Sequence, residues 1–470
     1  MPYKDFRAWI GKLEKEGELV RIKEQIKLEP DIGASSQASI LDNGPGLFFE
    51  SLPGYPPSHT LTIALMGSPR RLALSLDLPK HTGRREMVQE LVRRLGQPSI
   101  KPTRVFSAPL KEEKHFGSDV NLFEFPLHRL NIRDGGPYLT KTHIIMKDLE
   151  TGWTNVSMYR MQVKDRAKTN VWFTLGQHGG MIYRKWENAG KPMPMAVAFG
   201  VDPALTWVAV SKLQPGVDEY DVAGALRGEP LEVVRAETVD LDVPASAEVV
   251  LEGEVPPGIR EFEGPFGEYP GAYSHYHRIM VFHIKAITHR KNPIWDAVHI
   301  GKVPNENSVM FSVSRPAFDT EFLRRQFPEV MAVVPYHGSH QVVIQGNFRR
   351  HGDARRVMLG WFAGPHRDLV KHCIVVDEDI DPYDPVQVLW ALSYRFQADR
   401  DLVIIPNYAS VGFDPSETRG GLVTLCGFDA TKPKPPHLRY NLVGWVEPWK
   451  ETEDWRKRLN ETWGKEEKQR

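Results

Sequence analysis

Hydrophobic and polar positions follow two periods in the first hundred residues, and these periods predict short helices and strands. Apolar residues recur at helical spacing over 6–13 and again over 80–98. Alternation over 18–22 and an apolar run over 61–66 are typical of strands. The pattern predicts an N-terminal α/β segment over 1–115.

The pattern of hydrophobic and polar residues changes between about 118 and 300, where glycine and proline separate many short strand-like runs. These runs occupy residues 142–146, 170–175, 195–199, 206–210, 248–251, 278–287 and 293–297. Such a density of short strands is typical of a β-barrel or split barrel. We predict a central split β-barrel domain over 116–310.

Strand-like runs alternate with helical patterns in the last third of the chain, which predicts a C-terminal α/β domain over 311–445. Asp384 followed by Pro385 predicts a helix start. The charged tail over 446–470 carries spaced tryptophans, and we expect a terminal helix that docks on another subunit or on its own domain. The fold class predicted for the whole chain is α+β.

Composition narrows the class of protein. The chain has 470 residues, enough for two or three domains, with 60 Lys and Arg against 60 Asp and Glu. This balance gives no electrostatic case for binding nucleic acid or an anionic membrane. Only two cysteines occur, and no segment resembles a signal peptide or a membrane span. We expect a soluble cytoplasmic protein.

Several well-known catalytic motifs are absent from the sequence. There is no phosphate-binding G-x-x-x-x-G-K-[ST] loop, no G-x-G-x-x-G between a strand and a helix, no H-E-x-x-H and no G-x-S-x-G. The pairs His275 with His277 and His337 with His340 could ligate a metal. Pairs of this kind are more often part of polar loops.

The segment Glu263-Gly264-Pro265-Phe266-Gly267-Glu268 places two acids at the ends of a predicted turn. In a straight strand the two side chains would diverge, because an odd separation sends them to opposite faces. The glycines and the proline favour a turn or bulge that re-aims both acids. Two carboxylates in different environments suit acid/base chemistry. A surface turn with solvated acids is the alternative, and this stretch alone favours it.

Arg160 is the cation that such acids would pair with. On a strand over 155–160, it shares a face with Val156 and Met158 and is partly desolvated. It therefore needs carboxylate partners, which Glu263 and Glu268 could supply. A structural ion pair on a barrel wall remains the alternative.

A second polar set combines an amide, an imidazole and a carboxylate. Asn155, His178 and Glu219 offer oxygen and nitrogen donors that suit manganese or magnesium better than zinc, when phosphate and water complete the shell. Their spacing alone does not identify a metal site.

Six runs in chain order resemble the UbiD family of decarboxylases, which depend on prenylated FMN. They are Asn155 to Arg160, Gln177-His178, residues 198–203, 219–226 and 263–268, and Asp429-Ala430-Thr431. The resemblance covers nearly the whole chain. It implies an N-terminal α/β segment, a central split-barrel flavin domain and a C-terminal domain used for oligomerisation.

Carried over residue by residue, the resemblance implies a divalent ion, usually manganese, held by Asn155, His178 and Glu219 against the flavin phosphate. It implies that potassium sits on carbonyls near Val156 and 209–211. The residues that it implies for the flavin are Thr140, Ser157, Met158, Tyr159, Arg160, Gln177 and His178. One position departs from the family, because Leu425 stands where relatives often place a phosphate-binding lysine. Either Lys432 or Lys434 would replace it, or the phosphate would depend more heavily on the metal.

The resemblance also implies the reaction. Loss of CO2 from an sp2 carbon leaves a carbanion without an electron sink, which the cofactor must supply. The family does so through a covalent adduct between its substrate and the prenylated flavin. Arg160 would orient the substrate carboxylate, Glu263 would fix Arg160, and Glu268 would protonate the carbon. We expect reversible decarboxylation of an aromatic, heteroaromatic or α,β-unsaturated acid.

The substrate and the partners follow less directly. The polar candidates for the substrate pocket are His299, Asn305, Asn307, His337 and His340. Polar side chains of this kind favour a hydroxylated, heteroaromatic or dicarboxylated ring. A flavin prenyltransferase would supply the cofactor, and a homodimer or higher homo-oligomer is expected. Two alternatives are a non-catalytic or partner-dependent subunit of an aryl carboxylase and a flavin- or metal-binding module without decarboxylation.

Overall fold

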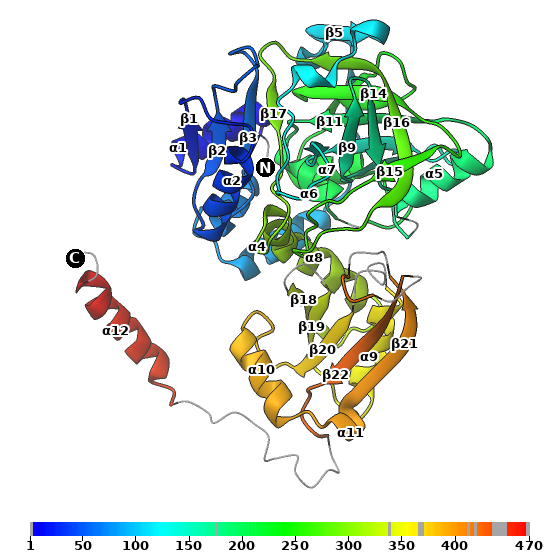
Figure 1. Cartoon of the computed structure of the whole chain (residues 1–470). Coiled ribbons are helices and arrows are strands. Elements are labelled where there is room, and N and C mark those ends of the chain that lie inside the picture. The colour runs from blue at the N-terminus through cyan, green and yellow to red at the C-terminus, as the bar shows by residue number, and fades with distance from the viewer. Residues whose placement is uncertain are drawn as a thin grey trace.

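A computed structural model describes residues 3–174, 176–211, 213–336, 340–364, 371–410, 414–417, 421–434 and 449–466. Three segments follow one another along the chain, and the terminal helix stands apart from them (Figure 1). The predicted α+β class with this threefold organisation is confirmed. No helix in the described ranges is long and apolar enough to cross a membrane.

The N-terminal segment is built on a small mixed sheet in the order β1-β2-β3-β17. Its strands are β1 (Leu19–Ile22), β2 (Gly46–Phe49), β3 (Thr60–Ile63) and β17 (Ile294–Asp296). The helices of this segment are α1 (Phe6–Lys15), α2 (Asp31–Leu41), α3 (Pro69–Ser75) and α4 (Arg84–Leu95). The last strand, β17, returns from the far end of the central segment and pairs parallel with β3. Two distant parts of the chain are thereby joined.

The central segment is a ten-stranded antiparallel sheet in the order β6-β9-β10-β16-β14-β11-β7-β8, with β5 and β15 also pairing with β16. Its strands are β5 (Glu113–Phe116), β6 (Tyr138–Leu139), β7 (His143–Lys147), β8 (Thr154–Ser157), β9 (Met161–Asp165), β10 (Lys168–Val171), β11 (Met193–Phe199), β14 (Val249–Val255), β15 (Arg260–Glu263) and β16 (His277–His289). A separate sheet contains β4 (Thr103–Val105), β12 (Glu232–Arg235) and β13 (Asp242–Pro244).

Three helices accompany the central sheet, and one of them corrects a prediction. They are α5 (His178–Asn188), α6 (Pro203–Ala209) and α7 (Glu219–Arg227). The strand predicted over 206–210 is wrong, because most of that run lies in α6. Asp202 caps this helix by accepting a hydrogen bond from the Ala204 amide at 2.6 Å, and Pro203 is its first residue. A short apolar run that is buried all round does not reveal its period, so the sequence could not separate helix from strand.

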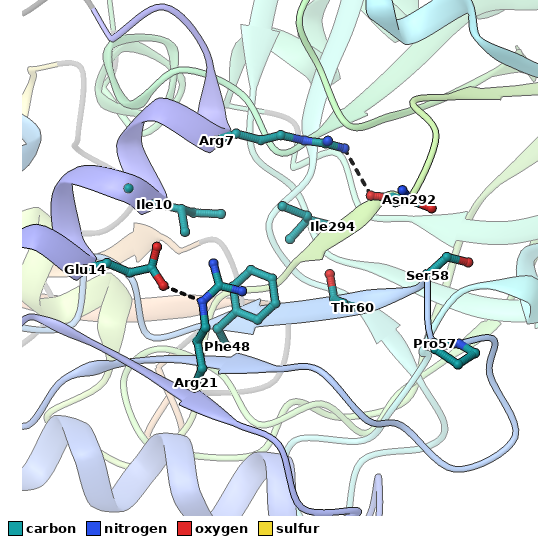
Figure 2. Close-up of a pocket in the computed structure, with 11 residues that line it drawn as sticks. Arg7, Ile10, Glu14, Arg21, Phe48, Pro57, Ser58, Thr60, Asn292 and Ile294 are labelled. Carbon is teal, nitrogen blue, oxygen red and sulfur yellow. Dashed lines mark hydrogen bonds and ion pairs between the residues drawn. The ribbon is translucent and has the colours of Figure 1, made fainter.

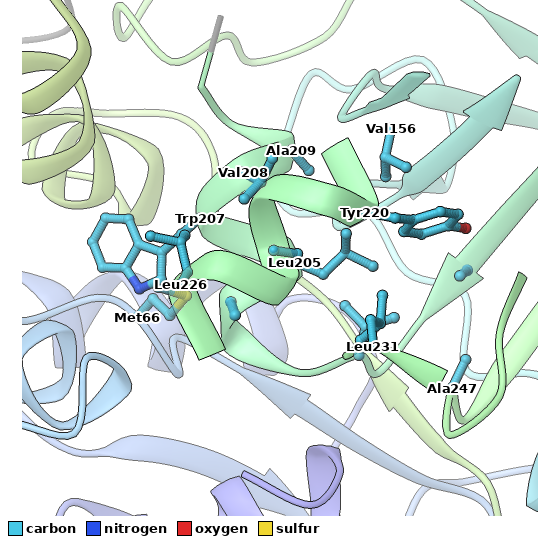
Figure 3. Close-up of a cluster of buried hydrophobic side chains, with 14 of the residues drawn as sticks. Met66, Val156, Leu205, Trp207, Val208, Ala209, Tyr220, Leu226, Leu231 and Ala247 are labelled. Carbon is cyan, nitrogen blue, oxygen red and sulfur yellow. The ribbon is translucent and has the colours of Figure 1, made fainter. Parts of the chain in front are cut away.

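The main core lies around α6 and α7 and reaches β8. Figure 3 shows Leu205 and Trp207 of α6 and Tyr220 of α7 among these buried side chains, with Val156 of β8 beside Tyr220. The Trp207 indole donates a hydrogen bond at 3.0 Å to Ser75 of α3. Because closely packed side chains resist displacement, this core holds β8 and the start of α7 in fixed positions.

The C-terminal segment begins with α8 (Glu306–Arg324) and contains a five-stranded sheet in the order β18-β19-β20-β22-β21. Its strands are β18 (Val330–Tyr336), β19 (Gln341–Gly346), β20 (His372–Asp377), β21 (Leu402–Ala409) and β22 (Leu422–Asp429). Its helices are α9 (Asp353–Phe362), α10 (Pro385–Tyr394) and α11 (Ala398–Asp401). The predicted cap is confirmed, since Asp384 accepts a hydrogen bond from the Val386 amide at 2.9 Å.

The terminal helix α12 (Thr452–Glu466) is present as expected. Its Trp455 and Leu459 are 57% and 46% exposed, so no other described part of the chain covers these two apolar side chains. Docking on its own domain is therefore not observed. Docking on another subunit stays a prediction.

Candidate active site

Arg160 lies buried between β8 and β9 and is held by both predicted acids. Its Nε and Nη2 donate to the two carboxylate oxygens of Glu263, each at 2.8 Å. Its Nη1 donates to Glu268 Oε1. Glu263 is 1% exposed and Glu268 7% exposed, so all three charges are removed from water together. A buried guanidinium requires such compensation. We call Arg160, Glu263 and Glu268 the Arg-Glu clamp.

The expectation that Arg160 lies on a strand with Val156 and Met158 is wrong. Strand β8 ends at Ser157 and β9 begins at Met161. The Thr142 hydroxyl explains the break, because it donates to the Tyr159 carbonyl and accepts from the Tyr159 amide at 3.3 Å. A side chain thus takes the place of the neighbouring strand, and the backbone turns Arg160 toward the two acids.

The segment between the two acids is a buried turn, so the alternative of a solvated surface turn is wrong. Gly264 adopts a φ of +105°, which residues with a side chain rarely adopt. The Gly267 amide donates to Asp134 Oδ1 at 2.8 Å, and the Gly135 amide donates to the Pro265 carbonyl at 2.8 Å. These bonds tie the turn to a neighbouring loop. The turn brings the two carboxylates back to one guanidinium.

The two carboxylates of the clamp are held unequally. Glu263 accepts two hydrogen bonds from Arg160 and a third from the Tyr138 hydroxyl at 2.9 Å. Glu268 accepts one from Arg160 and a longer one, 3.4 Å, from the Tyr269 amide. Hydrogen bonds that an anion accepts favour the charged form. Glu263 is therefore held by more hydrogen bonds than Glu268, whose second oxygen has only the long contact with the Tyr269 amide.

Tyr138 and Trp172 complete the surroundings of Arg160, and sequence reasoning missed both. The Arg160 Cζ lies 3.8 Å from the centroid of the Trp172 ring, a cation–π contact. Burial, followed by the charge of Glu263, raises the pKa of Tyr138, which keeps the phenol protonated as a donor. Neither residue stands at a spacing that links it to the clamp, so no local signal could have found them.

The structure also brings together Asn155, His178 and Glu219. They stand in β8 and at the first positions of α5 and α7. The Asn155 amide nitrogen lies 2.7 Å from Glu219 Oε1 and 3.3 Å from His178 Nδ1, and these two atoms are 3.8 Å apart. Adjacent ligands of an octahedral ion with bonds of ~2.1 Å are separated by about 3 Å. The spacing of the three groups fits a small divalent cation.

Burial governs the charge of Glu219 in this donor set. Burial raises the pKa of Glu219 to about 8, although the carboxylate accepts a hydrogen bond from the Val156 amide at 3.1 Å. A bound cation would favour the charged carboxylate, and rotation of the Asn155 amide would present its oxygen. The described residues contain no cluster of three or more His, Cys, Asp and Glu side chains that could hold a metal. The third member of this set, beside His178 and Glu219, is the amide of Asn155.

Three models of one protein family match the chain in order. They are the N-terminal domain of 3-octaprenyl-4-hydroxybenzoate carboxy-lyase over residues 10–93, its Rift-related domain over 102–303 and its C-terminal domain over 308–430. The phenolic acid decarboxylase of Bacillus subtilis strain 168 is 36% identical over 472 residues, which cover 98% of this chain and 99% of that protein. The chain belongs to the UbiD family. The resemblance seen in the sequence is confirmed.

Solved structures of UbiD enzymes share the fold. The closed form of vanillic acid decarboxylase from Sedimentibacter hydroxybenzoicus has a TM-score of 0.93 and 36% identity, over 98% of this chain and 99% of that one. An evolved dimeric form of the UbiD-class enzyme HmfF from Pelotomaculum thermopropionicum, in complex with prFMN, has a TM-score of 0.81 and 29% identity, over 96% and 98% of the two chains. This member of the UbiD family is a carboxy-lyase.

The residues that the family resemblance implies for the flavin surround the donor set and the clamp. Ser157 donates to Asn155 Oδ1 at 2.9 Å, and the Tyr159 hydroxyl accepts from the Gly179 amide at 3.0 Å, which fixes the start of α5. Gln177 is the residue just before α5. Thr140 is buried and accepts from the Val298 amide at 3.2 Å, while Met158 packs on the main core. Contact of these residues with a flavin stays a prediction.

The replacement expected for the phosphate-binding lysine finds no support. Leu425 is buried in the core of the C-terminal segment. The ammonium group of Lys432 pairs with Asp379 at 2.9 Å, and that of Lys434 pairs with Asp377 at 2.6 Å. Both charges are already matched by acids of their own segment. A phosphate would therefore depend more heavily on the donor set in the central segment.

Two of the polar candidates for substrate binding are engaged elsewhere. The His299 ring bonds to Ser36 Oγ at 2.8 Å and to Gln37 Oε1 at 3.0 Å, and burial lowers the pKa of this histidine to about 4. Asn305 caps α8 and donates to the Tyr269 and Gly301 carbonyls. Both side chains therefore join segments of the fold.

The other three candidates are Asn307, His340 and His337. Asn307 Oδ1 is buried without a hydrogen-bond partner among the described residues. His340 lies beside Tyr269, with a ring-centroid distance of 6.3 Å. His337 lies outside the described residues.

A cavity of about 530 Å³ opens on the N-terminal segment and lies apart from the clamp and the donor set (Figure 2). It is lined by Arg7 and Arg21 together with apolar side chains such as Phe48. Arg7 is bound to Glu248 at 2.8 Å, and Arg21 pairs with Glu14. Because both guanidinium groups are matched, the cavity shows no catalytic constellation.

Proposed function

We propose that this UbiD carboxy-lyase removes CO2 reversibly from an aromatic, heteroaromatic or α,β-unsaturated carboxylic acid, with prenylated FMN as its cofactor. The observation that carries the proposal is the Arg-Glu clamp, in which one buried guanidinium is shared by two unequally held carboxylates. The similarity to proteins named phenolic acid decarboxylase and to a prFMN complex supports it.

The cofactor and the clamp divide the chemistry. When bound, the prenylated flavin would supply the electron sink that the loss of CO2 requires. Arg160 has five N–H groups, of which four point at Glu263, Glu268 and Ser274. The fifth, on Nη1, is left for the substrate carboxylate. Arg160 therefore orients the group that leaves.

Glu268 carries the proton that replaces CO2 on the substrate carbon. Its anion accepts two hydrogen bonds where that of Glu263 accepts three, and the bond from the Tyr269 amide is long at 3.4 Å, so protonation of Glu268 disturbs the clamp less. A positioned general acid contributes typically ~10²–10⁴-fold to the rate. Glu263 does not transfer a proton in this scheme and keeps Arg160 in place.

Asn155, His178 and Glu219 would hold a divalent ion, for which Mn²⁺ is the proposed identity, and its charge would help to bind the flavin phosphate. Thr140, Ser157, Met158, Tyr159 and Gln177 line the flavin, and potassium occupies carbonyls near Val156 and 209–211. A flavin prenyltransferase supplies the cofactor, and the working form is a homo-oligomer.

The decisive experiment replaces the proton donor alone. Glu268→Gln, produced together with a flavin prenyltransferase, is expected to fold and to show the same flavin absorption spectrum as the wild type, but to release no CO2 from a panel of aromatic acids. The control is Glu261→Gln on β15, where the acid pairs at 3.0 Å with Lys168 at the surface. Turnover by Glu268→Gln that matches the control would remove Glu268 from the donor role.

A second candidate function is that of a subunit that needs a partner. The related vanillic acid decarboxylase is described as ShVdcCD, and one of its structures contains a truncated ShVdcD. CO2 release that appears only after a second subunit is added would favour this candidate. Bound ordinary FMN without CO2 release would instead favour a binding module. The intact clamp favours catalysis by the chain itself.

A further inference from the structure

Helix α8 carries a buried cation that the proposed mechanism does not use. Arg315 is 4% exposed, and its Nε and Nη2 have no hydrogen-bond partner among the described residues. The acid one turn further along, Asp319, comes within 3.7 Å of Nε, which is an ion pair but is longer than a hydrogen bond. Buried donors without acceptors are costly, so a group of this kind calls for an explanation.

A chain of ring contacts connects Arg315 with the proton donor. The Arg315 Cζ lies 5.8 Å from the centroid of the Phe311 ring, one turn earlier on α8. The Phe311 ring meets the Tyr269 ring edge-on at 5.7 Å, and Tyr269 directly follows Glu268 in the chain. The segment after the second acid and the first helix of the C-terminal segment therefore form one aromatic wall, with Glu268 at one end and Arg315 at the other.

His340 lies against the same wall and is neutral. Its ring stacks on Tyr269 at a centroid distance of 6.3 Å. Burial lowers the pKa of His340 to about 4; Asp414 opposes the shift, and Arg315 contributes to it. A neutral imidazole does not neutralise an anion. Arg315 is thus the cation of this wall that has donors to offer.

We propose that Arg315 determines substrate specificity by binding an anionic oxygen at the end of the substrate away from the carboxylate that leaves. This inference rests on the proposed function. The oxygen belongs to a phenolate or to a second carboxylate, and both match the planar fork of a guanidinium. Asp319, one turn along the helix, balances part of the charge while no substrate is bound. The substrate ring lies along Tyr269 and Phe311.

The test compares acids that differ only in the distal group: benzoate, 4-hydroxybenzoate and terephthalate. With the flavin-loaded wild type we expect kcat/KM for at least one of the oxygen-bearing acids to exceed that for benzoate by about 10-fold or more. Arg315→Gln is expected to lower that value about 10- to 100-fold, mostly through KM, because a hydrogen bond to a charged group is lost. Benzoate turnover stays within twofold, and Arg315→Lys restores part of the loss.

The pattern of loss identifies the oxygen, because an effect confined to 4-hydroxybenzoate indicates a phenolate and one confined to terephthalate a carboxylate. Arg324→Gln on the same helix is the matched control, because this arginine pairs with Glu321 at the surface. Equal loss for all three acids would show that Arg315 only supports the fold, and a wild type without preference would overturn the inference even if the variants do not fold.

Calorimetric titration of the flavin-loaded protein with the same acids separates the two proposals. Selective binding that Arg315→Gln abolishes, without CO2 release by the wild type, supports Arg315 and contradicts the proposed function. Decarboxylation of all three acids without preference supports the proposed function and contradicts the role of Arg315. Binding of none of the three acids overturns the inference.

Discussion

Glu263→Gln removes one of the two charges that hold Arg160 and adds no volume. The wild-type carboxylate accepts hydrogen bonds at 2.8, 2.8 and 2.9 Å from Arg160 and Tyr138, and it is almost fully buried. The amide keeps one acceptor and turns its NH2 group toward a donor of Arg160. Removing one partner of a buried ion pair costs ~3–5 kcal/mol of stability. Glu268 then becomes the sole anion beside Arg160 and is held in its charged form.

Two measurements follow from this change. Urea unfolding, followed by tryptophan fluorescence, is expected to show the loss of stability, and CO2 release by the flavin-loaded variant is expected to fall ~10²–10⁴-fold, because the acid form of Glu268 is less accessible. Glu261→Gln makes the same chemical change on the same strand at an exposed pair with Lys168, for which ~0–1 kcal/mol is expected. If the two variants unfold and turn over alike, the clamp does not act as described.

Two further predictions concern the metal donors and a buried histidine. The wild type is expected to contain a stoichiometric divalent ion that mass spectrometry detects, and either Glu219→Gln or dialysis against EDTA is expected to remove it. Asp221→Asn on the same helix is the control and retains the ion. A wild type that is active without metal contradicts this prediction. Burial lowers the pKa of His143 to about 3, and its ring is bound to the Ala198 carbonyl and to Thr206. Because the unfolded chain binds this proton below pH ~6.5, stability falls as the pH drops from 6.5 toward 3, by ~1.4 kcal/mol per unit. The stability advantage of the wild type over His143→Gln is therefore expected to shrink by ~2 kcal/mol between pH 7 and 5, and a difference independent of pH refutes the assignment.

Local patterns determined much of the architecture. The helix at the N-terminus, the capped start of α10 and most strands of the central and C-terminal sheets appear in the structure close to where periodicity and capping residues predicted them. The clamp residues and the donor set were named from motifs of the family, and the structure brings each set together. Helix caps, helical periods and strand alternation depend on neighbours a few positions apart, which the sequence displays directly.

Other features depend on contacts between residues far apart in the chain. Arg160 meets its acids across 103 and 108 positions, and the turn between those acids is buried because a neighbouring loop binds its amides. Local composition alone favoured a solvated turn there. Helix α6 was mistaken for a strand because burial on every side erases the period that distinguishes the two.

The side chains around the clamp and the buried cation Arg315 also depend on contacts between residues far apart in the chain. Tyr138, Trp172 and Arg315 stand in no motif and at no telling spacing, yet each lies on or near the predicted reaction site. The sequence identified the groups that we propose carry the chemistry, because those groups stand in recognisable motifs. Only the tertiary structure decided how strongly each acid is held and which cation keeps donors available, because both depend on what the folded chain packs around a charge once water has been removed.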